Sequence, residues 1–189
     1  PRLIAASTHA GEEELLLEAF AIVKQSHPEL QLIIAPRHTH RAAEVEALCT
    51  NAGFAVARRT SHQPCTDRDT ILLLDTMGEL GYAYGAADIA FVGGSLVPVG
   101  GHNFIEAVMA GAAVVMGPHL DDVKDIAAQL IEANGMLVVD STDELLRGLL
   151  SLVAEPSQRA AFTTRALDVC RRNRGAIDGA EALIVDLVK

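Results

Sequence analysis

The sequence predicts an α/β protein built on a doubly wound, Rossmann-like parallel sheet of about six strands. Short apolar runs alternate with amphipathic segments along all 189 residues, which is the pattern of repeated strand–helix units. Half of the residues are hydrophobic, yet only 4% are aromatic and tryptophan is absent. The core must therefore be aliphatic, as is typical of parallel sheets that helices cover on both faces. Right-handed crossovers between successive units would place all the strands in one open sheet.

Seven apolar runs are candidate strands, and they differ in strength. TILLLDT and IAFVGG are continuous enough for buried strands, whereas FAVARR is weaker and more polar. We expect strands at 3–7, 30–36, 54–59, 70–76, 89–94, 112–118 and 135–141. We expect helices at 12–25, 41–51, 77–87, 103–110 and 121–134, then one from Thr142, one from Pro156 and one that ends the chain. Acidic residues at 121–122 and 143–144 suit the positive N-terminal ends of two of these helices.

Composition and charge narrow the class of protein. A formal net charge of -10 argues against a nucleic-acid partner, because phosphate backbones need clustered cations. No apolar run reaches the roughly 18 residues of a membrane segment. We find no signal peptide, and Cys49, Cys65 and Cys170 lack zinc-ligand spacing, so we expect reduced thiols in a soluble, cytosolic chain. Because PRLIAAST reads as a strand already under way, we expect residues 1–189 to form one domain of a longer protein.

The segments that follow the strands carry the unusual residues. Ligands of open parallel sheets bind beyond the carboxyl ends of the strands. Five of the seven histidines and one arginine fall there: His9, Arg37, His38, His40, His102 and His119. Such a gathering attracts an anion even on an acidic protein. The stretch GGSLVPVGGHNFIEA adds glycines, whose amides can approach an anion, and the start of a helix. Asn103 and Glu106, three residues apart on that helix, can face one ligand, and the glutamate can accept from ribose hydroxyls.

Simpler interpretations exist for each segment. Ser7 and Thr8 would cap the helix that begins near Glu12, Gly93-Gly94 would be a tight strand exit, and Arg37 would pair with a surface carboxylate. A cluster of histidines is also consistent with a metal site, but no two histidines have the HxxxH spacing on a helix that would support one. A P-loop is excluded because its motif is absent, and no GxGxxG follows the first strand to support NAD binding. An anion or nucleotide site explains all the segments together.

Four stretches of the sequence resemble one family of proteins. They are ASTHAGEE, APRHTHR, DTMGELGYAYGAADIAFVGGSLVPVGGHNFIEA and VVMGP, and together they resemble the C-terminal half of 3-deoxy-D-manno-octulosonic acid (Kdo) transferases, which are GT-B glycosyltransferases of lipopolysaccharide synthesis. The resemblance implies transfer of Kdo from CMP-Kdo to a lipid A precursor at the cytoplasmic face of the inner membrane. It also implies that an N-terminal domain, absent from this chain, binds the acceptor and supplies the catalytic base. Glu12 and Glu79 are available carboxylates here, but we expect the isolated chain to transfer nothing.

The resemblance also implies a set of donor-binding residues. They are Ser7, Thr8, His9, Pro36, Arg37, His38, Met77, Gly78, Glu79, Gly94, Ser95, Gly100, Gly101, His102, Asn103 and Glu106. Those after the first strand would lie beside phosphate and sugar, those after the second beside cytosine and phosphate, and 77–79 at the base. Asn103 and Glu106 would face phosphate and ribose, and Arg37 would stabilise the departing CMP without a metal or cofactor.

Two features leave alternatives open. The family usually has Pro-Leu-Glu-Pro after the asparagine, where this chain has FIEA at 104–107. Because one fold serves many substrates, the motifs also fit another GT-B enzyme, such as a UDP-sugar transferase or a UDP-sugar 2-epimerase. A non-catalytic nucleotide-binding module is the third alternative.

Overall fold

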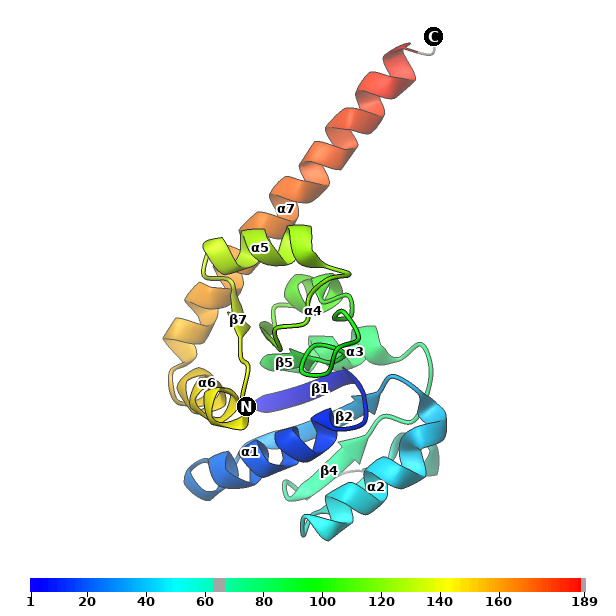
Figure 1. Cartoon of the computed structure of the whole chain (residues 1–189), viewed down its shortest axis with the longest axis vertical. Coiled ribbons are helices and arrows are strands. Elements are labelled where there is room, and N and C mark those ends of the chain that lie inside the picture. Colours follow the sequence, from blue (N-terminus) through cyan, green and yellow to red (C-terminus); the bar gives the residue numbers. More distant parts are fainter. Residues whose placement is uncertain (63–66, 188–189) are drawn as a thin grey trace.

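The computed structural model describes residues 1–62 and 67–187, with side chains through residue 173 (Figure 1). Its centre is one sheet of seven parallel strands in the order β3-β4-β2-β1-β5-β6-β7. The strands are β1 (Arg2–Thr8), β2 (Gln31–Pro36), β3 (Ala55–Arg58), β4 (Thr70–Leu73), β5 (Ile89–Val92), β6 (Ala113–Met116) and β7 (Met136–Val138). The doubly wound α/β fold is confirmed, but the expected count of about six strands is wrong. The weak run FAVARR is a true strand, and it is polar because β3 is an edge strand that pairs only with β4.

Helices cover both faces of the sheet (Figure 1). They are α1 (Glu12–Ser26), α2 (Ala42–Asn51), α3 (Leu80–Gly85), α4 (Ile105–Met109), α5 (Lys124–Glu132), α6 (Thr142–Ala154) and α7 (Pro156–Leu187), with 3₁₀ turns η1 (Thr39–Arg41) and η2 (Arg59–Ser61). Alternate residues of β1 enter two separate cores, as strand geometry requires. Leu3 and Ala5 pack with α1, α2 and α6, whereas Ile4 and Ala6 pack with α3, α4, α5 and α7.

Several predicted boundaries are too generous, and the excess lies at one edge of the sheet. Strands β4, β5 and β6 end at Leu73, Val92 and Met116, before the polar and glycine residues that follow them. Helix α3 begins only at Leu80 because Gly78 has a φ of 81°, a value that breaks a helix. The two helices expected after residue 155 are one continuous helix, α7. The residues trimmed from these elements form the loops of the candidate site.

Strands β2, β4 and β3 extend the sheet to one side of β1, and the last three strands extend it to the other side, so the switch point lies between β1 and β5. β2 lies on one side of β1 and β5 on the other, so the loops after β1 and β5 diverge at their carboxyl ends. Such a switch point is where open α/β sheets bind ligands. No helix among the described residues combines the length and apolar character needed to cross a membrane.

Two of the three cysteines lie in the hydrophobic cores. Cys49 and Cys170 are free thiols that lie buried, and Cys65 is outside the described residues. Burial raises the pKa of the Cys49 thiol to about 12, which keeps it protonated and unreactive at neutral pH.

Candidate nucleotide-binding site

The loop after β5, residues 93–102, is closed on itself and pressed against β1. The Gly101 amide donates to the Gly94 carbonyl at 2.7 Å and the His102 amide to the Gly93 carbonyl at 3.1 Å. A Cβ on Gly93 would lie 2.5 Å from the Ser7 carbonyl oxygen, so only glycine allows the ends of β1 and β5 to approach this closely. The interpretation of Gly93 as a packing residue is therefore correct, and the same packing brings the two loops of the site together.

Glu12 holds this loop in place through its backbone. The Glu12 side chain is fully buried, and its Oε1 accepts from the amides of Ser95 at 3.0 Å and Leu96 at 2.9 Å. Its Oε2 accepts from the amides of Gly94 and His9, both at 2.9 Å. The sequence offered Glu12 only as an available carboxylate, and the amides of Gly94 and Ser95 only as donors to an anion. A glutamate in the first turn of a helix is common, so its position gave no sign that it binds a distant loop.

The helix after β1 is not capped as the simpler interpretation expected. Gly11, with a φ of 93°, precedes α1, and no side chain bonds to the first turn from that position. Instead, Ser7 and Thr8 belong to β1 at an irregularity in its pairing with β2. Ser7 has a φ of 53°, a left-handed conformation that costs a non-glycine residue energy and is often found at functional sites.

Four of the five predicted rim histidines lie ring against ring. His9 Nε2 is 2.7 Å from His102 Nε2, and their rings stack with centroids 5.0 Å apart. His38 meets His9 edge to face at 5.9 Å and stacks on His40 at 5.4 Å. The fifth, His119, joins the loop through its backbone, which donates to the Ser95 carbonyl at 3.0 Å. The expectation that these histidines share one rim is thus confirmed for His9, His38, His40 and His102.

Burial, together with nearby cationic groups, lowers the pKa of both His9 and His102. Desolvation lowers the pKa of His9, and His38, Arg41 and Arg37 add to the effect, while Glu12 opposes it. Desolvation also lowers the pKa of His102, with contributions from His9 and Arg37 against Glu12 and Asp122. Because one ring nitrogen must donate to the other, the pair shares a single Nε2 proton.

This pair makes stability depend on pH. Both folded-state pKa values lie below the ordinary 6.5, so as pH falls through about 6.5 the unfolded chain binds protons first. The stabilisation is fully present above that pH and is lost below it. We expect the urea midpoint of unfolding to fall between about pH 7.5 and pH 5.5, and less so in a His9→Gln/His102→Gln double variant. Equal pH dependence in both proteins would contradict this assignment.

A small pocket lies beside the histidines, between the carboxyl ends of β1, β2 and β4. Its volume is about 160 Å³, which suits a single nucleobase rather than a whole nucleotide. Of the predicted site residues it is lined by Ser7, Pro36, Arg37, Met77 and Gly78. The resemblance implies that Pro36 and Arg37 lie beside cytosine and phosphate and that Met77 and Gly78 border the base, and these four residues line one cavity. His38 and Glu79, which the resemblance assigns to the same regions, are not among its lining residues.

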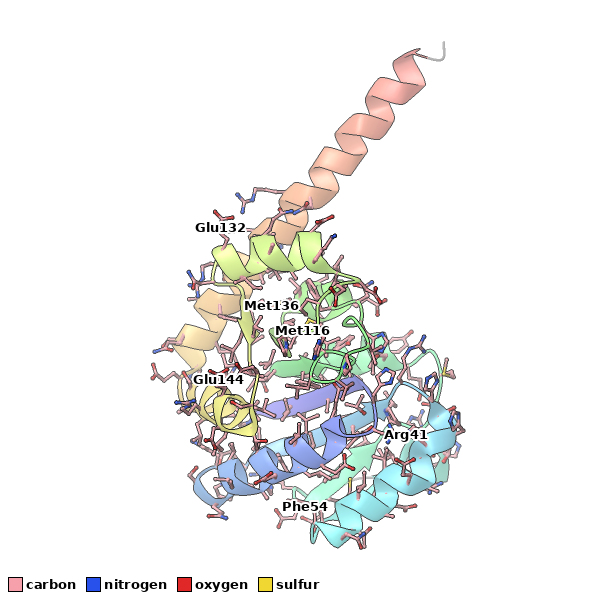
Figure 2. The ribbon with its side chains drawn as sticks, viewed as in Figure 1. Arg41, Phe54, Met116, Glu132, Met136 and Glu144 are labelled. Atoms are coloured by element: carbon pink, nitrogen blue, oxygen red, sulfur yellow. The ribbon has the colours of Figure 1, made fainter. Side chains whose placement is uncertain are left out.

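Arg37 and Arg41 both lie in the segment that follows β2, but they differ in their contacts with carboxylates. The Arg37 side chain is exposed, and no carboxylate among the described residues forms an ion pair with it, which disfavours its interpretation as a surface salt bridge. Arg41, labelled in Figure 2, donates to Oε1 of the fully buried Glu13 at 2.8 Å and to Glu44 at 2.6 Å. Arg41 therefore anchors the loop to α1, whereas Arg37 lines the pocket and has no ion-pair partner among the described residues.

Glu79 is engaged by its neighbours. Its carboxylate accepts from Arg59 at 2.9 Å and from the Thr76 hydroxyl. The hydrogen bond from Thr76, followed by Arg59, lowers the pKa of Glu79 below its ordinary value. A carboxylate with a lowered pKa is a weak base, so Glu79 orders the loop beside the pocket and is poorly suited to accept a proton from a sugar hydroxyl.

Asn103 and Glu106 are both exposed, but they do not lie on one helix as expected. Helix α4 begins at Ile105, and the Asn103 Oδ1 accepts from the Ile105 amide at 2.9 Å. This bond satisfies a backbone amide at the start of α4, and Asn103 therefore precedes the helix instead of lying on it. Glu106 faces α3, where a Cβ on Gly81 would come within 3.9 Å of its Oε2.

The other predicted site residues are buried at the end of β1 or in the loop after β5. Thr8, Gly94, Ser95, Gly100 and Gly101 lie out of solvent. Ser95 uses its hydroxyl to join two strand ends, donating to the Val92 carbonyl at 2.6 Å and accepting from the Gly117 amide at 2.8 Å. These residues shape the rim, while Arg37, His38, Met77, Gly78, Asn103 and Glu106 form its surface. Within the described part of the chain, no three His, Cys, Asp or Glu side chains are arranged to hold a metal ion.

The fold and the polar rim at its switch point define a Rossmann-like domain of the kind that forms the C-terminal half of GT-B glycosyltransferases. No protein-family model matches the sequence. The crystal structure of the C-terminal CMP-Kdo binding domain of WaaA from Acinetobacter baumannii is 34% identical, with a TM-score of 0.84 over 89% of this chain and 88% of that one. This chain belongs to the family of Kdo transferases, and it corresponds to their C-terminal domain.

Full-length relatives show the same relationship. The chain is 37% identical to the 3-deoxy-D-manno-octulosonic acid transferase of Haemophilus influenzae over 190 residues, covering 100% of this chain and 44% of that protein. It is 40% identical to the enzyme of Bordetella pertussis over 172 residues, which is 88% of this chain and 40% of that protein. The chain thus spans less than half the length of these relatives. The C-terminal domain of a glycosyl transferase group 1 family protein (LpcC) from Francisella tularensis, 17% identical with a TM-score of 0.62 over 90% of this chain and 84% of that one, shows the fold alone.

Proposed function

We propose that this chain is the donor-binding domain of an enzyme that transfers Kdo from CMP-Kdo to a lipid A precursor. The observation that carries the proposal is the similarity to the CMP-Kdo binding domain of WaaA, at 34% identity over 88% of that domain. The acceptor would be bound by an N-terminal half, and the full-length protein would work at the cytoplasmic face of the inner membrane. A UDP-N-acetylglucosamine 2-epimerase from Listeria monocytogenes and a structure bound with UDP-2-fluoro glucose are only 15% and 14% identical to this chain and support the fold only.

The geometry of the rim suggests how CMP-Kdo is held. The cytosine would enter the pocket of about 160 Å³ between Pro36 and Met77. Arg37, exposed at the mouth of that pocket, would meet the phosphate, whose negative charge grows as the bond to the sugar breaks. Glu106 would accept from the ribose hydroxyls, and the Asn103 amide group would donate to the phosphate. The sugar would then lie toward His9 and His102.

Neither of the two carboxylates that the sequence offered, Glu12 and Glu79, is placed to act as a catalytic base. The Glu12 carboxylate is buried and bound by four amides, and Glu79 is held by Arg59 and Thr76. Neither can approach an acceptor hydroxyl without breaking these bonds. The base would therefore come from the N-terminal half, and the isolated chain should bind nucleotide without transferring sugar.

Nucleotide preference tests the proposal. In calorimetric titrations of the chain with CMP, UDP and UDP-GlcNAc, we expect CMP to bind at least about tenfold more tightly than either uridine nucleotide, a difference of about 1.4 kcal/mol. The cytosine amino group is the donor that uracil lacks, and a pocket that pairs with it would leave a polar group unsatisfied around uracil. A clear preference for UDP would favour a UDP-sugar enzyme and exclude the proposal.

A further inference from the structure

The Glu12 carboxylate bridges the two loops of the site. Its Oε2 accepts from His9, at the end of β1, and from Gly94, at the end of β5. We propose that Glu12 is a positioning residue of the donor site, which fixes the His9–His102 pair and closes the anion-binding turn after β5. The proposal deepens the assignment of a nucleotide-sugar site at this rim and rests on it.

Glu12 occupies the place that an anion would take. Three consecutive amides, those of Gly94, Ser95 and Leu96, converge on its two oxygens, and such a turn of successive amides is an anion-binding concavity. Hydrogen bonds to a carboxylate are shorter and stronger than neutral ones, and here they are removed from water because Glu12 is fully buried. The glycine amides that the sequence offered to the phosphate are thus bound by the protein itself. The donor phosphate must instead approach the exposed side of the rim, where Arg37 lies.

Glu12 influences the position of His102 through the hydrogen bonds that close the loop after β5. With Gly94 held by Glu12, the Gly94 carbonyl receives the Gly101 amide at 2.7 Å and the Gly93 carbonyl receives the His102 amide at 3.1 Å. His102 is thereby set 2.7 Å from His9, whose own amide Glu12 holds at 2.9 Å. One carboxylate therefore determines the backbone position of both histidines. Because a shift of about 1 Å in a positioned group can reduce activity by about 10²-fold, this control matters for binding at the rim.

The isosteric change Glu12→Gln tests the role. It keeps the side-chain shape but turns one oxygen into an amide donor that faces two backbone donors. We expect the shared Nε2 proton of His9 and His102 to disappear from ¹⁵N spectra of the histidine rings. We also expect CMP affinity, measured by calorimetry, to fall by about tenfold or more. In the wild-type chain, the amide protons of Gly94, Ser95 and Leu96 should exchange slowly with solvent, a measurement that needs no variant.

Two controls separate positioning from stability. Glu14→Gln removes the same charge from the same helical turn. Glu14 is exposed, and its carboxylate accepts from the Gly11 amide at 3.1 Å, so the change should leave the histidine spectra and CMP affinity unchanged. Val23→Ala creates a cavity in α1 at a fully buried position; it should lower stability without changing either readout.

The outcomes distinguish this proposal from the proposed function. If Glu12→Gln folds and keeps the His9–His102 signal, or if the three wild-type amides exchange rapidly, Glu12 is not the positioning residue. Loss of the signal in Val23→Ala as well would reduce its role to stability and overturn the proposal. If the wild-type chain fails to bind CMP while the histidine and amide results hold, the nucleotide assignment is at fault and the positioning of the two loops stands.

Discussion

Replacing Arg37 with alanine in a full-length enzyme that contains this chain should reduce Kdo transfer by about 10²–10³-fold, the cost of removing one preorganised donor to a developing charge. Arg37 is exposed beside the pocket and forms no ion pair within the described residues, so the fold does not depend on its charge. The free energy of unfolding should therefore stay near that of the wild type.

Glu106→Ala, which removes the proposed ribose contact, should reduce transfer by about 10²-fold in the same assay.

The neighbouring arginine provides the matched control. Arg41→Ala breaks the ion pair with Glu13, whose side chain is fully buried, and leaves that carboxylate unpaired, so it should cost about 3 kcal/mol or more of stability. Steady-state kinetics with CMP-Kdo and urea unfolding measure the two effects separately. If Arg37→Ala and Glu106→Ala both transfer Kdo at near wild-type rates, the site lies elsewhere.

Gly117→Ala should cost as much stability as Arg41→Ala, through backbone packing rather than through charge. Gly117 follows β6, and a Cβ there would lie well inside van der Waals contact of the Ser95 carbonyl and the Leu96 amide. These are backbone atoms held in turn by Glu12 and by β5, so they cannot move aside as a flexible side chain would. We expect a loss of about 3 kcal/mol or more in the free energy of unfolding, at or beyond the upper end for overpacking.

Gly85→Ala is the control for this substitution. A Cβ at Gly85 would meet nothing within 4 Å, and Gly85 is the last residue of α3, so alanine should be neutral or slightly stabilising. Thermal unfolding of both variants compares the same change in two environments. A Gly117→Ala protein as stable as Gly85→Ala would show that the loop after β5 is not packed against β6 as described.

Much of the fold could be predicted because it depends on patterns along the chain. Continuous apolar runs predicted the buried strands β4 and β5, and alternation with amphipathic segments predicted the doubly wound sheet. The number of strands was less certain, because the edge strand β3 needs little apolar sequence. The boundaries after residues 73, 92 and 116 were wrong because the runs continue into residues that bond outside the sheet, such as Asp75, Gly94 and Gly117.

The sequence by itself determined which residue types gather at the rim. The rule that strand carboxyl ends share one edge placed His9, Arg37, His38 and His102 together, and the four quoted stretches indicated the family. Tertiary structure alone decided which of the polar groups near the rim are bound within the protein and which are left exposed. Glu12 binds the amides of the loop after β5, Arg41 takes Glu13, and Arg37 is left without a carboxylate partner among the described residues. The reason is physical: which donor meets which acceptor depends on distances between strand ends far apart in sequence, and no local pattern encodes those distances.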